Sequence, residues 1–100
     1  LLAYLSADRI MDVRVTVAGN PRTQDAALAA LASDKSWEVR EALARNPHIG
    51  PRILEDLSGH WSWMVRAAVA ENPNTPVQTL KQLAKDADQS VQKVARGRIE

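Results

Sequence analysis

The sequence predicts an all-α solenoid of paired short helices, because a single 26-residue unit repeats along it without insertion. Val13-Arg14, Val39-Arg40 and Val65-Arg66 lie 26 residues apart, and each pair is followed at a fixed distance by an alanine and then by Asn-Pro. Leucines recur with the same period in the second half of each unit. A repeat of this length is a supersecondary unit that buries its apolar face only against its neighbours.

The period divides the chain into three full units and two partial ones. The full units are residues 13–38, 39–64 and 65–90, and the partial ones are residues 1–12 and 91–100. We therefore expect about three and a half repeats in a single domain of 100 residues. Because the chain starts within a unit and without methionine, we expect it to be a fragment of a longer protein.

Each unit begins with a short helix that carries a narrow apolar stripe. Val39, Leu43 and Ala44 have the spacing of one helical face. Asn-Pro ends this helix, because proline disfavours helical geometry in the residue before it and has no N–H to donate. We expect the asparagine side chain to bond to nearby backbone. The expected N-caps of the first helices are Ser36, Ser62 and Asp88.

The second half of each unit predicts another short helix. Leu54 and Leu57 are three residues apart and so lie on one helical face. Thr75-Pro76 is expected to begin this helix as N-cap and first helical residue, and Thr23 to cap the equivalent helix. The segment Ile49-Gly50-Pro51 departs from this pattern. Helices of two to three turns are marginal alone, so stacking must stabilise them.

Residues 39–57 and 65–83 share the pattern Val-Arg, then Ala-x-Asn-Pro, then two leucines three residues apart. This pattern resembles the leucine-rich repeat variant family (LRV) and, more loosely, HEAT-like repeats. The resemblance implies a right-handed superhelix of paired short helices, some of which can be 3₁₀. Some members of the family carry a cysteine-rich iron–sulfur module, but this chain has no cysteine for one.

The composition excludes several kinds of chemistry. The absence of cysteine excludes disulfides and thiolate metal sites. His48 and His60 have no third ligand at a useful spacing, so we expect no metal. No nucleophile elbow, phosphate loop or paired-acid signature is present, and we expect neither enzymatic activity nor a cofactor. No apolar run approaches the ~20 residues that cross a bilayer, and we expect a cytoplasmic protein.

The arginines of the Val-Arg pairs are expected to form ion pairs. Asp8 precedes Arg14 by six residues, and Asp34 precedes Arg40 by the same interval. HEAT-like units pair an aspartate with an arginine at this offset, and charge-assisted hydrogen bonds would then tie each loop to the next helix. The residues of this predicted ladder are Asp8, Arg14, Asp34, Arg40 and Arg66.

Two junctions interrupt the predicted ladder. His60 stands where an aspartate would precede Arg66, and Gln92 stands where an arginine would follow Asp86. We therefore expect these two junctions to be the weakest in the stack.

The tryptophans are candidates for a partner surface. Trp37 and Trp63 occupy the same position in successive units, and Trp61 lies two residues before the second of them. Tryptophan is enriched in binding hot spots, but indoles also fill gaps between short helices, and the sequence leaves both readings open. The candidate contact residues are Trp37, Trp61, Trp63, His60 and Arg45.

The repeat pattern favours a non-catalytic scaffold for protein–protein interaction, with a partner that the sequence does not identify. The alternatives are a nucleic-acid-binding HEAT-like module, including a repeat fragment of a DNA-repair protein, and a purely structural spacer. Each full unit is formally neutral, whereas nucleic-acid binding needs a clustered basic stripe. The apolar end at Leu1-Leu2 suggests a homodimer, and we expect no membrane partner.

Overall fold

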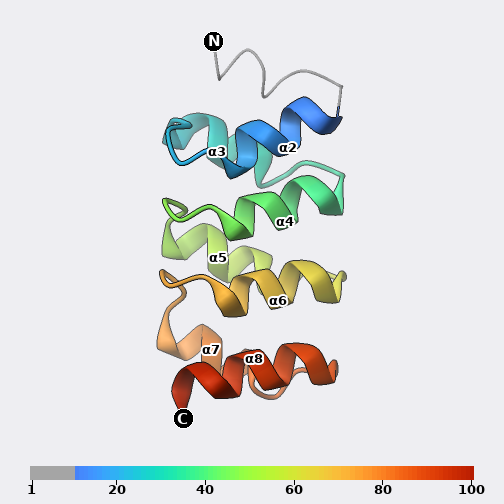
Figure 1. Cartoon of the computed structure of the whole chain (residues 1–100), viewed down its shortest axis with the longest axis vertical. Coiled ribbons are helices and arrows are strands. Elements are labelled where there is room, and N and C mark those ends of the chain that lie inside the picture. Colours follow the sequence, from blue (N-terminus) through green and yellow to red (C-terminus); the bar gives the residue numbers. More distant parts are fainter. Residues whose placement is uncertain (1–10) are drawn as a thin grey trace.

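The computed structural model describes residues 11–100, which form seven α-helices and, within that range, no strand (Figure 1). The longer helices are α2 (Met11–Gly19), α4 (Trp37–Arg45), α6 (Trp63–Glu71) and α8 (Gln89–Ile99). The shorter helices are α3 (Asp25–Leu31), α5 (Pro51–Leu57) and α7 (Val77–Leu83). The helix pairs predicted from the sequence are present, with longer and shorter helices alternating, and none of these seven is a 3₁₀-helix.

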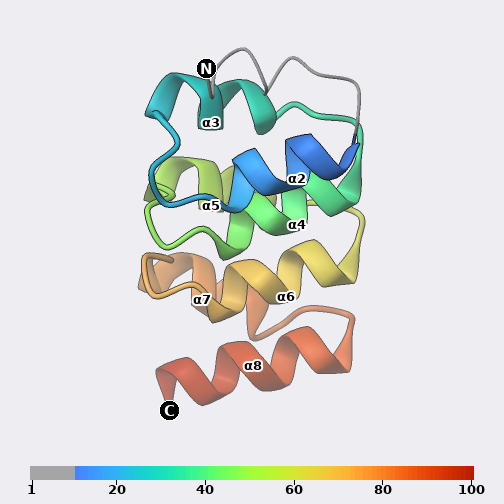
Figure 2. The same ribbon diagram turned by 45° about the horizontal axis from the view of Figure 1, so that its top comes forward.

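The helices are arranged in two rows. Helix α2 packs on α4, α4 on α6, and α6 on α8, so the longer helices form a stack along the longest axis (Figure 1). The shorter helices form the second row, behind the first (Figure 2). The principal extents are 41 × 20 × 15 Å. Each inner helix of the stack is therefore covered on two sides by its neighbours.

The core runs continuously along the stack and is built from the predicted apolar stripes. Val39, Leu43 and Ala44 of α4 have no exposed area, and neither do Val65 and Val69 of α6. Several alanines of the longer helices belong to this core, and a side chain this small lets neighbouring backbones approach closely. The fully buried alanines are Ala18, Ala44, Ala68, Ala70 and Ala95.

The asparagines of the Asn-Pro pairs tie each helix pair to the preceding one. Asn46 Nδ2 donates to the backbone oxygens of Ala18 at 2.8 Å and Asn20 at 3.0 Å. Asn72 repeats the arrangement one unit later, donating to Ala44 O at 2.7 Å and to Asn46 O at 3.0 Å. We call these contacts the asparagine ties. Because both side chains are buried, the ties satisfy helix-end carbonyls that water cannot reach.

The same asparagines also close their own turns, as the sequence predicted. The side-chain oxygen of Asn46 accepts from His48 N, and that of Asn72 accepts from Asn74 N, both at 2.8 Å. The sequence predicted this local role but not the longer-range ties.

Arg98 occupies the equivalent position in α8. Its Nη1 donates to Ala70 O at 2.7 Å and to Asn72 O at 3.1 Å, so a guanidinium replaces the asparagine amide. A longer side chain thus meets the same two carbonyls from within a helix.

The predicted threonine caps are wrong. Thr23 and Thr75 lie before the N-caps Gln24 and Pro76, and their hydroxyls donate to Val17 O and Val69 O at 2.6 Å. Both threonines are buried, so each hydroxyl satisfies a carbonyl at the end of the preceding helix instead of capping the next one. In α5 the N-cap is Gly50, and a proline is the first helical residue, which suits a position whose N–H needs no partner.

The predicted N-cap positions of the longer helices are confirmed, although their side chains differ in use. Ser36 and Ser62 precede α4 and α6 but make no side-chain cap hydrogen bond. Asp88 precedes α8 and accepts from Ser90 N at 2.8 Å and Val91 N at 3.2 Å.

We expect Asn72→Ala to destabilise the fold by about 2–4 kcal/mol, because it leaves buried carbonyls of Ala44 and Asn46 without their donor. Asn20→Ala is the matched control, since within residues 11–100 the Asn20 side chain only accepts from Arg22 N. Chemical denaturation followed by circular dichroism measures both. An equal loss in the two variants would contradict a stabilising role for the tie.

Candidate functional site

Two arginines of the longer helices form partly buried ion pairs with aspartates. Arg14 Nε lies 2.7 Å from Asp34 Oδ2, and Arg66 Nε lies 2.8 Å from Asp86 Oδ2. In each pair Nη2 also donates to the other carboxylate oxygen, at 3.4 Å and 3.2 Å respectively. The aspartate lies 20 residues after its arginine, in the loop that leads into the next longer helix. The ion pairs therefore connect successive helix pairs.

The predicted register of the ladder is wrong. Asp34 pairs with Arg14 and not with Arg40, because each arginine extends toward the following helix pair. Arg66 meets the loop six residues before it through backbone carbonyls, since its Nη1 donates to His60 O at 2.8 Å and Trp61 O at 2.9 Å. Asp8 lies outside the described residues, so its predicted pair with Arg14 stays a prediction.

The junctions at His60–Arg66 and Asp86–Gln92 are not the ones that lack an ion pair. Arg66 has its carboxylate in Asp86 and does not need one at position 60. Gln92 donates to Asp86 O, so it takes the carbonyl contact that an arginine would make. The junction that lacks a carboxylate is the one between α4 and α6.

Each paired aspartate also orders its own loop. Asp34 Oδ1 accepts from Ser36 N at 3.0 Å, and Asp86 Oδ1 accepts from Asp88 N at 2.8 Å. Burial raises the pKa of Asp86, but the hydrogen bonds from Arg66 and from the Asp88 backbone, together with the Arg66 charge, hold that pKa below its ordinary value. The folded chain thus favours the charged carboxylate.

His60 stands at the position equivalent to Asp34 and Asp86, 26 residues from each. Its Nδ1 accepts from Ser62 N at 3.0 Å, so the imidazole keeps the loop contact of the aspartate. It cannot replace the negative charge, and the side chain of Arg40 makes no hydrogen bond or ion pair with residues 11–100. Within the described part of the chain, the buried Arg40 Nε has no hydrogen-bond acceptor.

A second polar group at this junction also lacks its acceptor. Ser36 Oγ hydrogen-bonds to Glu38 Oε1 at 2.8 Å, but Met64 stands in the place of that glutamate one unit later. The equivalent Ser62 Oγ is buried and has no hydrogen-bond partner among residues 11–100. We call Arg40, His60 and Ser62 the His60 junction.

Protonation of His60 is disfavoured in the fold. The side chain is only 7% exposed, and burial lowers its pKa below the ordinary value of 6.5. The positive charges of Arg40 and Arg66 lower the pKa further. Because Nδ1 accepts a hydrogen bond, the neutral ring carries its proton on Nε2.

The three tryptophans differ in exposure. Trp61 is 74% exposed and Trp63 is 46% exposed, whereas Trp37 packs partly buried against the core. The Trp61 ring centroid lies 5.1 Å from that of His60, with the planes tilted by 32°. Trp37 therefore fits the gap-filling reading, and Trp61 and Trp63 provide the exposed surface. We call these last two residues the tryptophan edge.

Arg45 and Trp37, both in the predicted partner surface, lie at opposite ends of one helix. Trp37 and Arg45 are the first and last residues of α4, which places them about 12 Å apart along the helix axis. Arg45 is instead engaged by Glu41 at 3.1 Å and Glu71 at 3.2 Å. The prediction that placed Arg45 with the tryptophans did not consider the length of α4.

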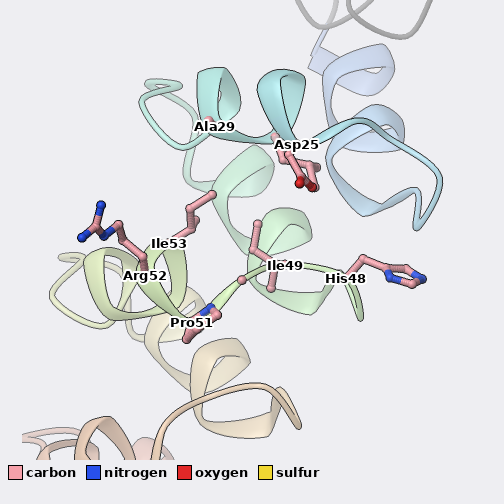
Figure 3. Close-up of a pocket in the computed structure, with 9 residues that line it drawn as sticks. Asp25, Ala29, His48, Ile49, Pro51, Arg52 and Ile53 are labelled. Carbon is pink, nitrogen blue, oxygen red and sulfur yellow. The ribbon is translucent and has the colours of Figure 1, made fainter.

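A separate hollow of about 440 Å³ lies between α3 and α5 (Figure 3). Ile49 and Ile53 contribute apolar surface to it, while His48 and Arg52 point away from it on opposite sides. Its polar groups do not converge on a common point, as a ligand site would need.

Metal-binding clusters and membrane-spanning helices are both absent from the described part of the chain. Residues 11–100 contain no cluster of three or more His, Cys, Asp or Glu residues that could hold a metal. No helix in that range combines the length and apolar character needed to cross a bilayer.

We expect Asp34→Ala to destabilise the fold by about 1–3 kcal/mol, because it removes the carboxylate that accepts from Nε and Nη2 of the partly buried Arg14. Arg40→Ala is the comparison, since Arg40 has no such partner to lose. Thermal and denaturant unfolding measure both. A smaller loss for Asp34→Ala than for Arg40→Ala would contradict the register found here.

We expect stability to fall as pH drops below about 6.5, since the unfolded chain takes up a proton on His60 more readily than the folded chain does. The stabilising neutral ring is fully present above that pH. His60→Asn keeps an acceptor for Ser62 N but does not titrate, so its melting temperature should change less between pH 7.5 and pH 5. His48 is present in both proteins, and identical pH profiles would contradict the prediction.

One repeat unit of the chain is similar to a known protein family. Residues 63–88 match the family model described as Leucine rich repeat variant. This stretch comprises α6, α7 and the loop that carries Asp86. No curated protein and no solved structure gave a significant match. The resemblance indicated by the Val-Arg and Asn-Pro positions is confirmed at residues 63–88, which match a repeat of the leucine rich repeat variant family.

Proposed function

We propose that this chain is a section of a right-handed α-solenoid, built from about three and a half 26-residue units, that acts as a non-catalytic scaffold for protein–protein interaction. The stacked longer helices and the equivalent contacts of Asn46 and Asn72 support the solenoid. The match to a repeat family supports the scaffold role. Solenoids of this kind present extended surfaces on which exposed positions differ while packing positions repeat.

The observation that carries the proposal is the exposure of the tryptophan edge. Trp61 is 74% exposed. An indole that stays in solvent buries little apolar area and so contributes little to the stability of the fold. Trp63 lies two residues away on the same loop and helix start. Adjacent exposed indoles are typical of the centres of protein interfaces, where tryptophan contributes much of the binding energy.

The charge arrangement favours a protein partner over a nucleic acid. Arg14 and Arg66 are paired with aspartates, and Arg45 lies between two glutamates. These side chains are therefore neutralised within the chain and do not form the open basic stripe that phosphates require.

Two further expectations stay predictions. Dimerisation through the apolar segment Leu1-Leu2 concerns residues outside the described part of the chain. The cytoplasmic location was inferred from composition alone.

We expect Trp61→Ala to leave the helical circular dichroism and the melting temperature nearly unchanged while abolishing partner binding. Affinity capture by the wild-type chain and by the variant, followed by mass spectrometry, should identify proteins that depend on this indole.

Val77→Ala is the matched control, since Val77 is 60% exposed but begins the short helix α7, away from the tryptophan edge. It should capture the same proteins as the wild type. Cooperative loss of the fold in Trp61→Ala would show that this residue belongs to the core. Capture that is indifferent to both substitutions would contradict the proposed binding edge.

A further inference from the structure

The His60 junction lacks negative charge that the equivalent junctions possess. Arg14 and Arg66 each bind an aspartate through Nε and Nη2. The aspartate that would serve Arg40 is replaced by His60, and the glutamate that would serve Ser62 is replaced by Met64. Two carboxylates are thus missing from one place in the stack.

Each polar group left at this junction can donate a hydrogen bond. The guanidinium of Arg40 donates only, and its buried Nε is without an acceptor. The proton of neutral His60 lies on Nε2, which has no acceptor among residues 11–100. Ser62 Oγ is buried without a partner as well. Donors that lack acceptors in a partly buried site are costly, and an anion would satisfy them.

No carboxylate of the neighbouring loops is free to move in. Asp34 is held by Arg14 and by Ser36 N, and Asp86 is held by Arg66 and by Asp88 N. The loop itself, residues 58–62, contains no acidic residue. No carboxylate of residues 11–100 therefore pairs with Arg40, and a partner molecule could supply one.

The surroundings indicate what kind of molecule brings the anion. The exposed Trp61 ring is in contact range of the His60 ring, and Trp63 is half exposed beside it. A free inorganic anion would make no use of these indoles. A peptide segment that carries a carboxylate next to an apolar side chain would use both features.

We propose that the His60 junction binds an aspartate or glutamate side chain of a protein partner, with Trp61 packing against an apolar residue beside it in the partner sequence. The bound carboxylate takes the place of the missing ladder aspartate and accepts from Arg40 and from His60 Nε2. This inference rests on the proposed function, to which it adds the chemistry of the partner.

The direct test uses the peptide Ac-Gly-Leu-Asp-Leu-Gly-NH2 as probe, together with its asparagine counterpart. Titrations followed by NMR report on the Arg40 Nε–H and on the Trp61 indole N–H. The aspartate peptide should shift both signals in a saturable manner, while the asparagine peptide should bind at least tenfold more weakly. An unmoved Arg40 signal, or equal shifts from the two peptides, would overturn the proposal.

His60→Asp provides a variant in which loss of binding cannot be confused with loss of fold. The new carboxylate should pair with Arg40, raise the melting temperature and abolish binding of the aspartate peptide. Retention of binding in this variant would overturn the proposal.

Inorganic phosphate is the competing probe, because it distinguishes a peptide site from a general anion site. It should shift the Arg40 signal only weakly and leave the Trp61 indole unmoved. If phosphate shifted both signals as strongly as the aspartate peptide, the assignment to an acidic peptide would be wrong.

Failure of the acidic-peptide site would leave the proposed function intact, because the Trp61-dependent capture of partners is measured separately. If captured partners bound the wild type and His60→Asp equally well, the scaffold role would stand and the acidic site would fall. Loss of both kinds of binding in Trp61→Ala and in His60→Asp would support the two proposals together.

Discussion

The fold depends on satisfying the carbonyls at the ends of very short helices. An α-helix leaves its last four carbonyls without an intrahelical partner, so a nine-residue helix such as α4 leaves nearly half of its acceptors to be satisfied elsewhere. In this stack those ends are buried, and the amides of Asn46 and Asn72 supply the donors across each junction. Each of these side chains reaches two carbonyls of the preceding unit, and the constant 26-residue period keeps both carbonyls within range. Arg98 shows that reach and donor geometry matter more than the amide itself.

A second contact fixes the other end of the same helices. The asparagine ties act at the carboxyl ends of the longer helices, whereas Arg14 and Arg66 act from their amino-terminal halves. A helix held at both ends is constrained in position and in angle. Between α4 and α6 the tie from Asn72 and the exposed ion pair between Arg45 and Glu71 both act at the carboxyl ends, whereas Arg40 forms no ion pair with residues 11–100 on the amino-terminal side. The less constrained side of this junction is the side that carries the tryptophan edge.

Much of the fold could be predicted from the sequence, because the repeat fixed the helix positions and the Asn-Pro stops. The register of the ion pairs could not be predicted. An aspartate 20 residues after one arginine is also six residues before the next, since the two offsets add up to one 26-residue period. Periodicity alone cannot distinguish Asp34 paired with Arg14 from Asp34 paired with Arg40. Only the direction in which the arginine extends decides between them.

The site could be predicted only in part, for a related reason. Trp37 and Trp63 share one position in the repeat, yet Trp37 packs on the core and Trp63 is half exposed. The position of a residue in the repeat unit determines which helical turn carries its side chain. The exposure of that side chain depends on residues from the neighbouring units. Likewise, the threonine hydroxyls could cap a following helix or satisfy a preceding one, and burial of Thr75 decides for the second.

The substitutions at the His60 junction are best understood together. Replacing an aspartate by His60 and a glutamate by Met64 removes acceptors that the preceding unit uses, so each change costs stability. Trp61 adds an indole that lies mostly in solvent and returns little of that stability. Some residues are present because a partner binds them and not because the fold needs them. At such positions we expect residues that destabilise the chain and expose apolar surface. Packing of the helices therefore does not explain the residues at the His60 junction, where the repeat pattern is interrupted.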